Sequence, residues 1–185
     1  MLIFVFLVIF STTSYSKNSE YLMSLIRKEV GEFTKIKKIQ VKDTISENPI
    51  NNELIRVLNS GVTVGFARNI STTTGCNSAC LPINYISFYD KAGTFLGLSS
   101  KDGLTKINHT PFTKEDYSNL EFILSTNTNV FNNVNHPKEM TDAISGETLK
   151  LYSSSVVKGA AYSTLRIHLY NQDTIKYIKS LNKTK

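Results

Sequence analysis

Two cysteines four positions apart are the residues of this chain whose type and spacing most directly permit chemistry. Cys76 and Cys80 are its only cysteines, and they stand just before a predicted β-hairpin. Two thiols this close form a disulfide in an oxidising compartment, because a tight turn brings their Cα atoms within the about 4.4–6.8 Å that a disulfide spans. As thiolates, the same pair has the soft donor atoms that bind copper(I) or zinc. The spacing predicts a Cys76–Cys80 disulfide, with thiol redox chemistry or copper binding as the alternative.

A second candidate is the segment 141–148, which reads Thr-Asp-Ala-Ile-Ser-Gly-Glu-Thr. Gly146 lacks a Cβ, so a phosphate group and a modifying enzyme can approach the backbone there. If Thr148 stands at the start of a helix, free N–H groups and the helix dipole favour a phosphate beside it. The same pattern is also an ordinary loop-to-helix turn in which Ser145 or Thr148 caps the helix.

This segment resembles the Asp-x-x-Ser-Gly-Ala-Thr motif of the FMN-binding domain family, which occurs in extracytoplasmic subunits of ion-pumping redox complexes. The resemblance covers roughly residues 83–165. It implies that a separate FMN transferase attaches FMN to the hydroxyl of Thr148 through a phosphoester bond. Asp142 and Ser145 would then be motif residues, and Gly146 the position of close approach. The implied function is electron transfer to or from a redox partner protein, with the flavin supplying the chemistry.

The first sixteen residues have the pattern of a signal peptide. Leu2–Phe10 is an unbroken apolar run, Ser11–Ser16 is small and polar, and the first charged residue is Lys17. Nine residues of helix, at about 1.5 Å each, cannot cross a hydrocarbon core of about 30 Å, but they match the hydrophobic region of a signal peptide. The pattern predicts a signal peptide over 1–16 and a mature domain over 17–185, located in the periplasm or outside the cell. The alternative is a buried strand at the N-terminus.

Composition narrows the classes of function that remain. A chain of 185 residues with 41% hydrophobic and 19% charged residues fits one globular domain. The net charge of +6 comes from scattered lysines that are not interleaved with aromatic residues, so no nucleic-acid surface is predicted. No later segment has the roughly 20 apolar residues of a membrane span, so we expect no stable membrane insertion after cleavage. The three histidines have no close metal-ligand spacing, and no metal site is predicted.

The expected elements describe a single α+β domain in which a mainly antiparallel sheet packs against several helices. Apolar spacing predicts a helix over 20–30, and Thr113 with Asp116 forms a capping box for a helix over 113–124. The clearest hairpin spans 83–98, closed by Asp90–Gly93. Other extended segments are expected at 33–41 and 62–66, and 51–58 is a short amphipathic segment. The C-terminal region 156–181 is expected to be helical with a break at Asn171–Asp173, where Asp173 caps the last helix.

Two classes of function follow. The first is an exported FMN-binding-like protein that transfers electrons through a flavin at Thr148. The second is a non-catalytic exported binding module in which Cys76–Cys80 closes a loop, and a thiol redox or copper-binding protein is a lesser alternative. The sequence favours an electron carrier or a binding protein over a stand-alone enzyme.

Overall fold

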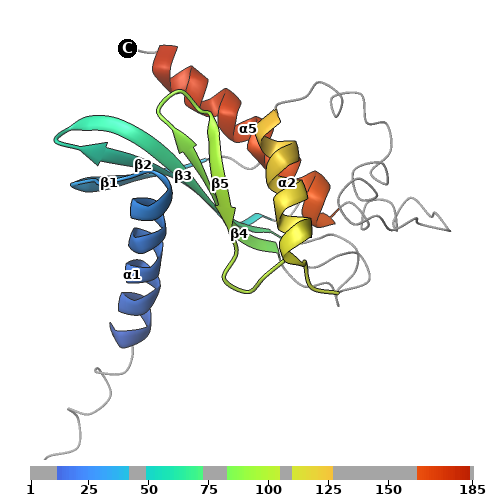
Figure 1. Cartoon of the computed structure of the whole chain (residues 1–185). Coiled ribbons are helices and arrows are strands. Elements are labelled where there is room, and N and C mark those ends of the chain that lie inside the picture. Colours follow the sequence, from blue (N-terminus) through green and yellow to red (C-terminus); the bar gives the residue numbers. More distant parts are fainter. Residues whose placement is uncertain (1–11, 42–48, 73–82, 105–109, 127–161, 184–185) are drawn as a thin grey trace, which may run out of the picture.

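Five strands pair, each with the next along the chain, into one antiparallel sheet in the order β1-β2-β3-β4-β5 (Figure 1). The computed structural model describes residues 12–41, 49–72, 83–104, 110–126 and 162–183. Within these residues the strands are β1 (Lys35–Gln40), β2 (Pro49–Asn59), β3 (Val62–Thr72), β4 (Ile83–Asp90) and β5 (Phe95–Ser99), and the helices are α1 (Thr12–Glu29), α2 (Lys114–Thr126) and α5 (Tyr162–Lys183). This arrangement confirms the predicted α+β fold with an antiparallel sheet.

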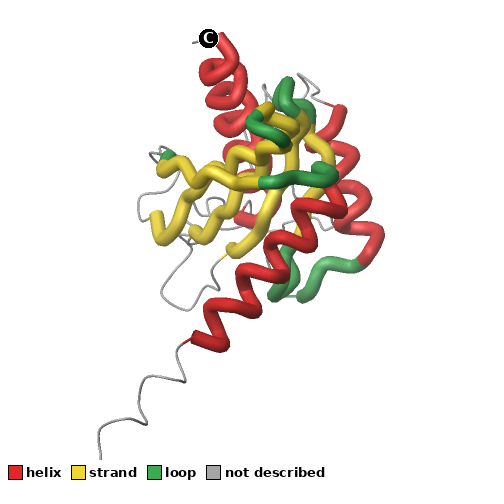
Figure 2. The backbone as a smooth tube through the Cα atoms, turned by 90° about the vertical axis from the view of Figure 1, so that its left-hand side faces the viewer, coloured by secondary structure: helices red, strands yellow, loops and turns green. Residues whose placement is uncertain are grey.

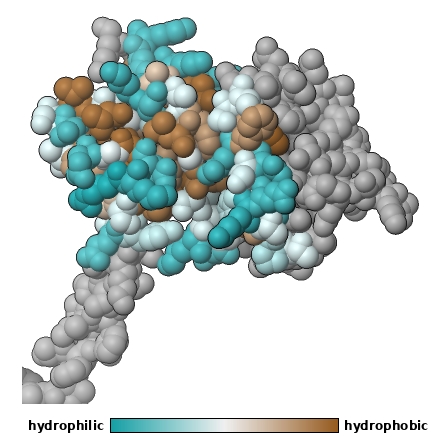
Figure 3. Space-filling view, in the orientation of Figure 1, coloured by the Kyte–Doolittle hydropathy of each residue, from teal (hydrophilic) through white to brown (hydrophobic). Residues whose placement is uncertain are grey.

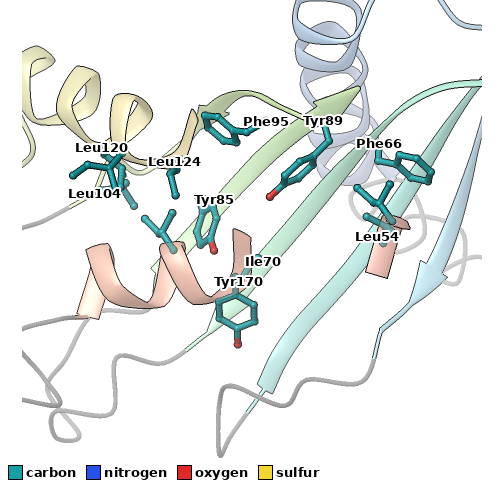
Figure 4. Close-up of a cluster of buried hydrophobic side chains, with 13 residues drawn as sticks. Leu54, Phe66, Ile70, Tyr85, Tyr89, Phe95, Leu104, Leu120, Leu124 and Tyr170 are labelled. Atoms are coloured by element: carbon teal, nitrogen blue, oxygen red, sulfur yellow. The ribbon is translucent and has the colours of Figure 1, made fainter. Parts of the chain in front are cut away.

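The two faces of the sheet are covered by different helices, as Figure 1 and Figure 2 show. Successive side chains of a strand point to opposite faces, so Ile55 and Val57 of β2 pack with Ile26 of α1, whereas Leu54 belongs to the core under α2 and α5. Figure 4 shows part of that second core, where Phe66 of β3 and Tyr89 of β4 lie with Leu54. The sheet is therefore the middle of three layers.

Helix α1 is held by a narrow apolar stripe. Leu22, Leu25 and Ile26 recur at helical spacing and pack on the sheet, and Ile26 is fully buried. Gly31 ends the helix in the left-handed region, with φ of 110°, which glycine adopts at little cost. The helix begins at Thr12, upstream of the predicted cleavage point before Lys17. That cleavage remains a prediction.

Two tight turns fix the strand registers. Ser60 and Gly61, with φ of 48° and 83°, form a two-residue turn between β2 and β3 in which both central residues have positive φ, as in type I′ hairpins. The segment 51–58, expected as a short amphipathic segment, is part of β2. In the predicted hairpin of β4 and β5, which is confirmed, the Asp90 carboxylate accepts N–H bonds from Ala92 and Thr94 at 2.8 Å each. Burial acts to raise the pKa of Asp90, but these hydrogen bonds outweigh it and lower the pKa.

The start of α2 confirms the predicted capping box. The backbone N–H of Thr113 donates to Oδ2 of Asp116 at 2.6 Å, and the N–H of Asp116 donates to Oγ1 of Thr113 at 3.2 Å. Two N–H groups that the helix itself leaves without acceptors are thereby satisfied.

The predicted break in the C-terminal helix is wrong, because α5 runs without interruption from Tyr162 to Lys183. Asn171 and Asp173, which suggested a helix end, instead have partners on the sheet: Asn171 accepts a hydrogen bond from Tyr89, and Asp173 forms an ion pair with Arg68. Polar side chains in mid-helix are compatible with the helix when tertiary partners satisfy them. None of the described helices is long and apolar enough to cross a membrane.

Candidate functional site

A groove of about 690 Å³ lies between α1 and the sheet. The helix contributes one wall, formed by Ser19, Tyr21, Leu22 and Met23. The sheet contributes the other side, with Lys38, Glu53, Asn69, Asn84, Ile86 and Ser99. Lys101 and Asp102, which follow β5, also line it.

Strand register explains why the groove forms at this place. Glu53, Asn69, Ile86 and Ser99 are direct partners across β2, β3, β4 and β5, so they form one row across the sheet. They share a face with Ile55, Ala67 and Phe88, which stand two positions along β2, β3 and β4 and pack under α1. Because this row is mostly polar, it offers the apolar stripe of α1 little to pack against. The helix and the sheet accordingly leave a hollow here.

The charges that line the groove balance. Glu53 forms an ion pair with Lys38 at 3.1 Å and accepts a hydrogen bond from Gln40 Nε2 at 3.4 Å. Lys101 and Asp102 add one further charge of each sign. The chain as a whole carries +6, and none of this positive surplus is found among the described residues of the groove lining. On the face shown in Figure 3, hydrophilic and hydrophobic residues are interspersed over the described surface.

The side-chain amides that line the groove have hydrogen-bonding groups that the described residues do not use. Oδ1 of Asn84 accepts a bond from the Ser71 hydroxyl at 2.6 Å. Its Nδ2 group, and the whole side-chain amide of Asn69, make no hydrogen bond within the part of the chain that the structure describes. Both residues are half-buried. A side-chain amide carries two donor hydrogens and an acceptor oxygen, so these groups can bind a polar ligand in the groove.

The opposite face of the sheet holds a buried polar cluster. Arg68 of β3 is fully buried, and its Nη2 atom lies 3.6 Å from Oδ2 of Asp173 on α5. The Tyr89 hydroxyl donates to Oδ1 of Asn171 at 2.8 Å and lies 3.0 Å from the Ser87 hydroxyl. Sequence reasoning missed this cluster. The sequence signal that could have revealed the cluster is an arginine between Phe66 and Ile70, at a core-facing position of an alternating strand.

Burial of Tyr89 makes the free energy of unfolding sensitive to alkaline pH. Burial raises the pKa of this tyrosine from 10.0 to about 12, although hydrogen bonding with Ser87 and Thr174 acts in the other direction. Because the folded chain holds this proton more tightly than the unfolded chain, the contribution is complete below about pH 10 and is lost as the pH rises to about 12. We expect a decrease of about 3 kcal/mol in the free energy of unfolding across that interval.

Urea unfolding at a series of alkaline pH values measures this decrease. Tyr89→Phe should remove the part of the pH dependence that comes from this hydroxyl, while Tyr21→Phe, at an exposed position, should leave that part in place. An unchanged slope in Tyr89→Phe would assign the alkaline loss to other groups.

The residues singled out by the sequence lie outside the described part of the chain. They are Cys76 and Cys80 in 73–82, and Asp142, Ser145, Gly146 and Thr148 in 127–161. His168 is buried in α5, and burial lowers its pKa. Among the described residues, no group of three or more His, Cys, Asp or Glu side chains could hold a metal ion.

Comparison with protein-family models, with curated proteins and with solved structures gave no match for this chain.

Proposed function

We propose that the protein is a non-catalytic, extracytoplasmic binding module that holds a small polar ligand between α1 and the sheet. The observation that carries this proposal is the groove with the amides of Asn69 and Asn84 in its lining. Its volume of about 690 Å³ falls within the roughly 300–1,000 Å³ of small-molecule sites. A ligand that bonds to these amides gains interactions that the fold itself does not use.

The chemistry of the lining favours binding over catalysis. General acid–base and nucleophilic catalysis need a nucleophile or proton-transfer group held by a second group in hydrogen-bonding distance. In the described lining, Glu53 is already paired with Lys38, and Asp102 is exposed. Neither cysteine nor histidine is among the described lining residues. These groups can orient a ligand, and they form no nucleophile–base pair.

Substitution of Asn69 tests the groove. Asn69→Leu keeps a side chain of similar size and removes the amide, so it should weaken ligand binding about tenfold or more, which corresponds to one lost hydrogen bond of about 1.5 kcal/mol. Asn119→Leu, the same exchange on α2 and away from the groove, is the matched control. The measurement is the ligand-induced shift in melting temperature over a library of polar small molecules, followed by titration calorimetry.

The proposal predicts that ligands shift the melting temperature of the parent protein and of the Asn119 variant alike. A ligand that binds Asn69→Leu as tightly as the parent would place the binding site elsewhere. Circular dichroism of both variants checks that each is folded.

As the alternative function, we propose, on the motif at 141–148 alone, that the exported chain carries FMN at Thr148 and transfers electrons through it. Co-expression with an FMN transferase, with the native residues 1–16 retained, should then add the mass of one FMN and give flavin absorption bands. Thr148→Ala should abolish both, whereas Thr141→Ala, at the other end of the same segment, should retain them. Flavin that persists in Thr148→Ala contradicts the assignment.

The same intact-mass measurement tests export and the cysteine pair. A mass that corresponds to a chain starting at Lys17 supports signal cleavage, and the absence of two further hydrogens supports the Cys76–Cys80 disulfide. Copper bound by the reduced protein and lost in Cys76→Ser would instead favour the metal alternative.

A further inference from the structure

We infer that the ligand of the groove is uncharged and rich in hydroxyl groups, the chemistry of a short neutral oligosaccharide. This inference rests on the proposed binding function and specifies its ligand class. The first observation is charge balance: among the described residues, two lysines and two carboxylates line the groove, and Lys38 is already neutralised by Glu53 at 3.1 Å. An anionic or cationic ligand would need a surplus of the opposite charge, because burying an uncompensated charge is unfavourable.

The second observation is the mixture of donors and acceptors. Asn69 offers both kinds of group, Asn84 offers its Nδ2 donors, and the Ser99 hydroxyl both donates and accepts. A sugar hydroxyl likewise donates and accepts, so neighbouring hydroxyls on one ring can bond to a single amide. Ligands that carry only acceptors, such as phosphates, would leave the amide and hydroxyl oxygens without partners.

The third observation is the shape and the apolar part of the lining. From Glu53 on β2 to Ser99 on β5 the row crosses three strand spacings, about 14 Å at roughly 4.8 Å each. An elongated ligand can follow this row. Tyr21 on the α1 wall is 39% exposed, so its ring is available to pack against the C–H face of a sugar ring.

Titration calorimetry with defined trisaccharides tests the inference on the full exported protein. The probes are a neutral glucose trisaccharide, a neutral N-acetylglucosamine trisaccharide, trigalacturonate and a tripeptide with blocked ends. We expect a neutral trisaccharide to bind with an affinity that hardly changes between low and high salt. Asn69→Leu and Tyr21→Ala should each weaken this binding about tenfold or more, and Tyr21→Phe should retain it because the ring remains.

The outcomes separate the ligand class from the binding function. If trigalacturonate or the peptide binds and Asn69→Leu removes that binding, the groove is a ligand site but the neutral-saccharide class is wrong. Failure of all neutral saccharides to bind also overturns the ligand class. If the library of polar small molecules also gives no ligand for the groove, the proposed binding function is wrong as well.

Discussion

Replacing Arg68 with alanine should lower the free energy of unfolding by about 3–5 kcal/mol. The arginine side chain is fully buried among β3, β4 and α5, and its guanidinium lies 3.6 Å from the carboxylate of Asp173. Truncation removes the ion pair that joins the sheet to α5 and leaves a cavity in the core. The urea dependence of circular dichroism measures the change.

Arg56→Ala is the matched control on the neighbouring strand. Arg56 is half-buried, and its guanidinium carbon lies 5.8 Å from the centre of the Phe66 ring. Loss of this cation–π contact should cost about 1 kcal/mol. Arg68→Met should recover part of the loss, because methionine refills the volume and Asp173 keeps 31% of its side chain exposed. Equal losses in the two alanine variants would show that burial and the ion pair of Arg68 contribute little.

Gly65→Ala should destabilise the fold by about 3 kcal/mol, at the upper end of the effects of overpacking. A Cβ at this position would lie 2.6 Å from the backbone carbonyl oxygen of Tyr89 and 2.5 Å from Cγ1 of Val30. The carbonyl belongs to the paired strand β4 and cannot move without disturbing the ladder. The contact with Val30, which directly follows α1, would also push that end of the chain away from the sheet.

Gly97→Ala provides the comparison on β5. Among the described residues, its Cβ would meet the carboxylate of Glu29, at 3.0 Å from Oε2, and the end of this flexible side chain can move aside. We expect a change within about 1 kcal/mol. Because α1 forms one wall of the groove, Gly65→Ala should also weaken ligand binding, whereas Gly97→Ala should not. Thermal unfolding and ligand titration of the two variants measure both effects, and equal behaviour would argue against close packing at Gly65.

Local features of the fold could be predicted from the sequence, because neighbouring residues determine them. The hairpin around Asp90 and the capping box of Thr113 and Asp116 each depend on contacts within a few residues. The unbroken α5 could not be predicted in this way. Asn171 and Asp173 are ordinary helix-ending residues until Tyr89 and Arg68, from distant strands, supply their partners.

The groove also could not be predicted from short stretches of sequence. Asn69, Ile86 and Ser99 belong to three strands, and only the strand register aligns them in one row. Each residue alone is an unremarkable strand position. The sequence drew attention instead to Cys76, Cys80 and the segment 141–148, which lie outside the described residues. Their chemistry remains a prediction for the mass measurement.

The position of Arg68 also has a consequence for how the chain assembles. Each strand from β2 to β5 pairs with the strand before it in the chain. The sheet can therefore form strand by strand as the chain is synthesised from its N-terminus. Helix α5 is the last of the described elements, and until it docks, the apolar face of the new sheet is open to other molecules. A charge in the middle of that face keeps it hydrated and disfavours association with a second copy. We therefore expect Arg68, which the finished core encloses, to disfavour aggregation while the chain folds.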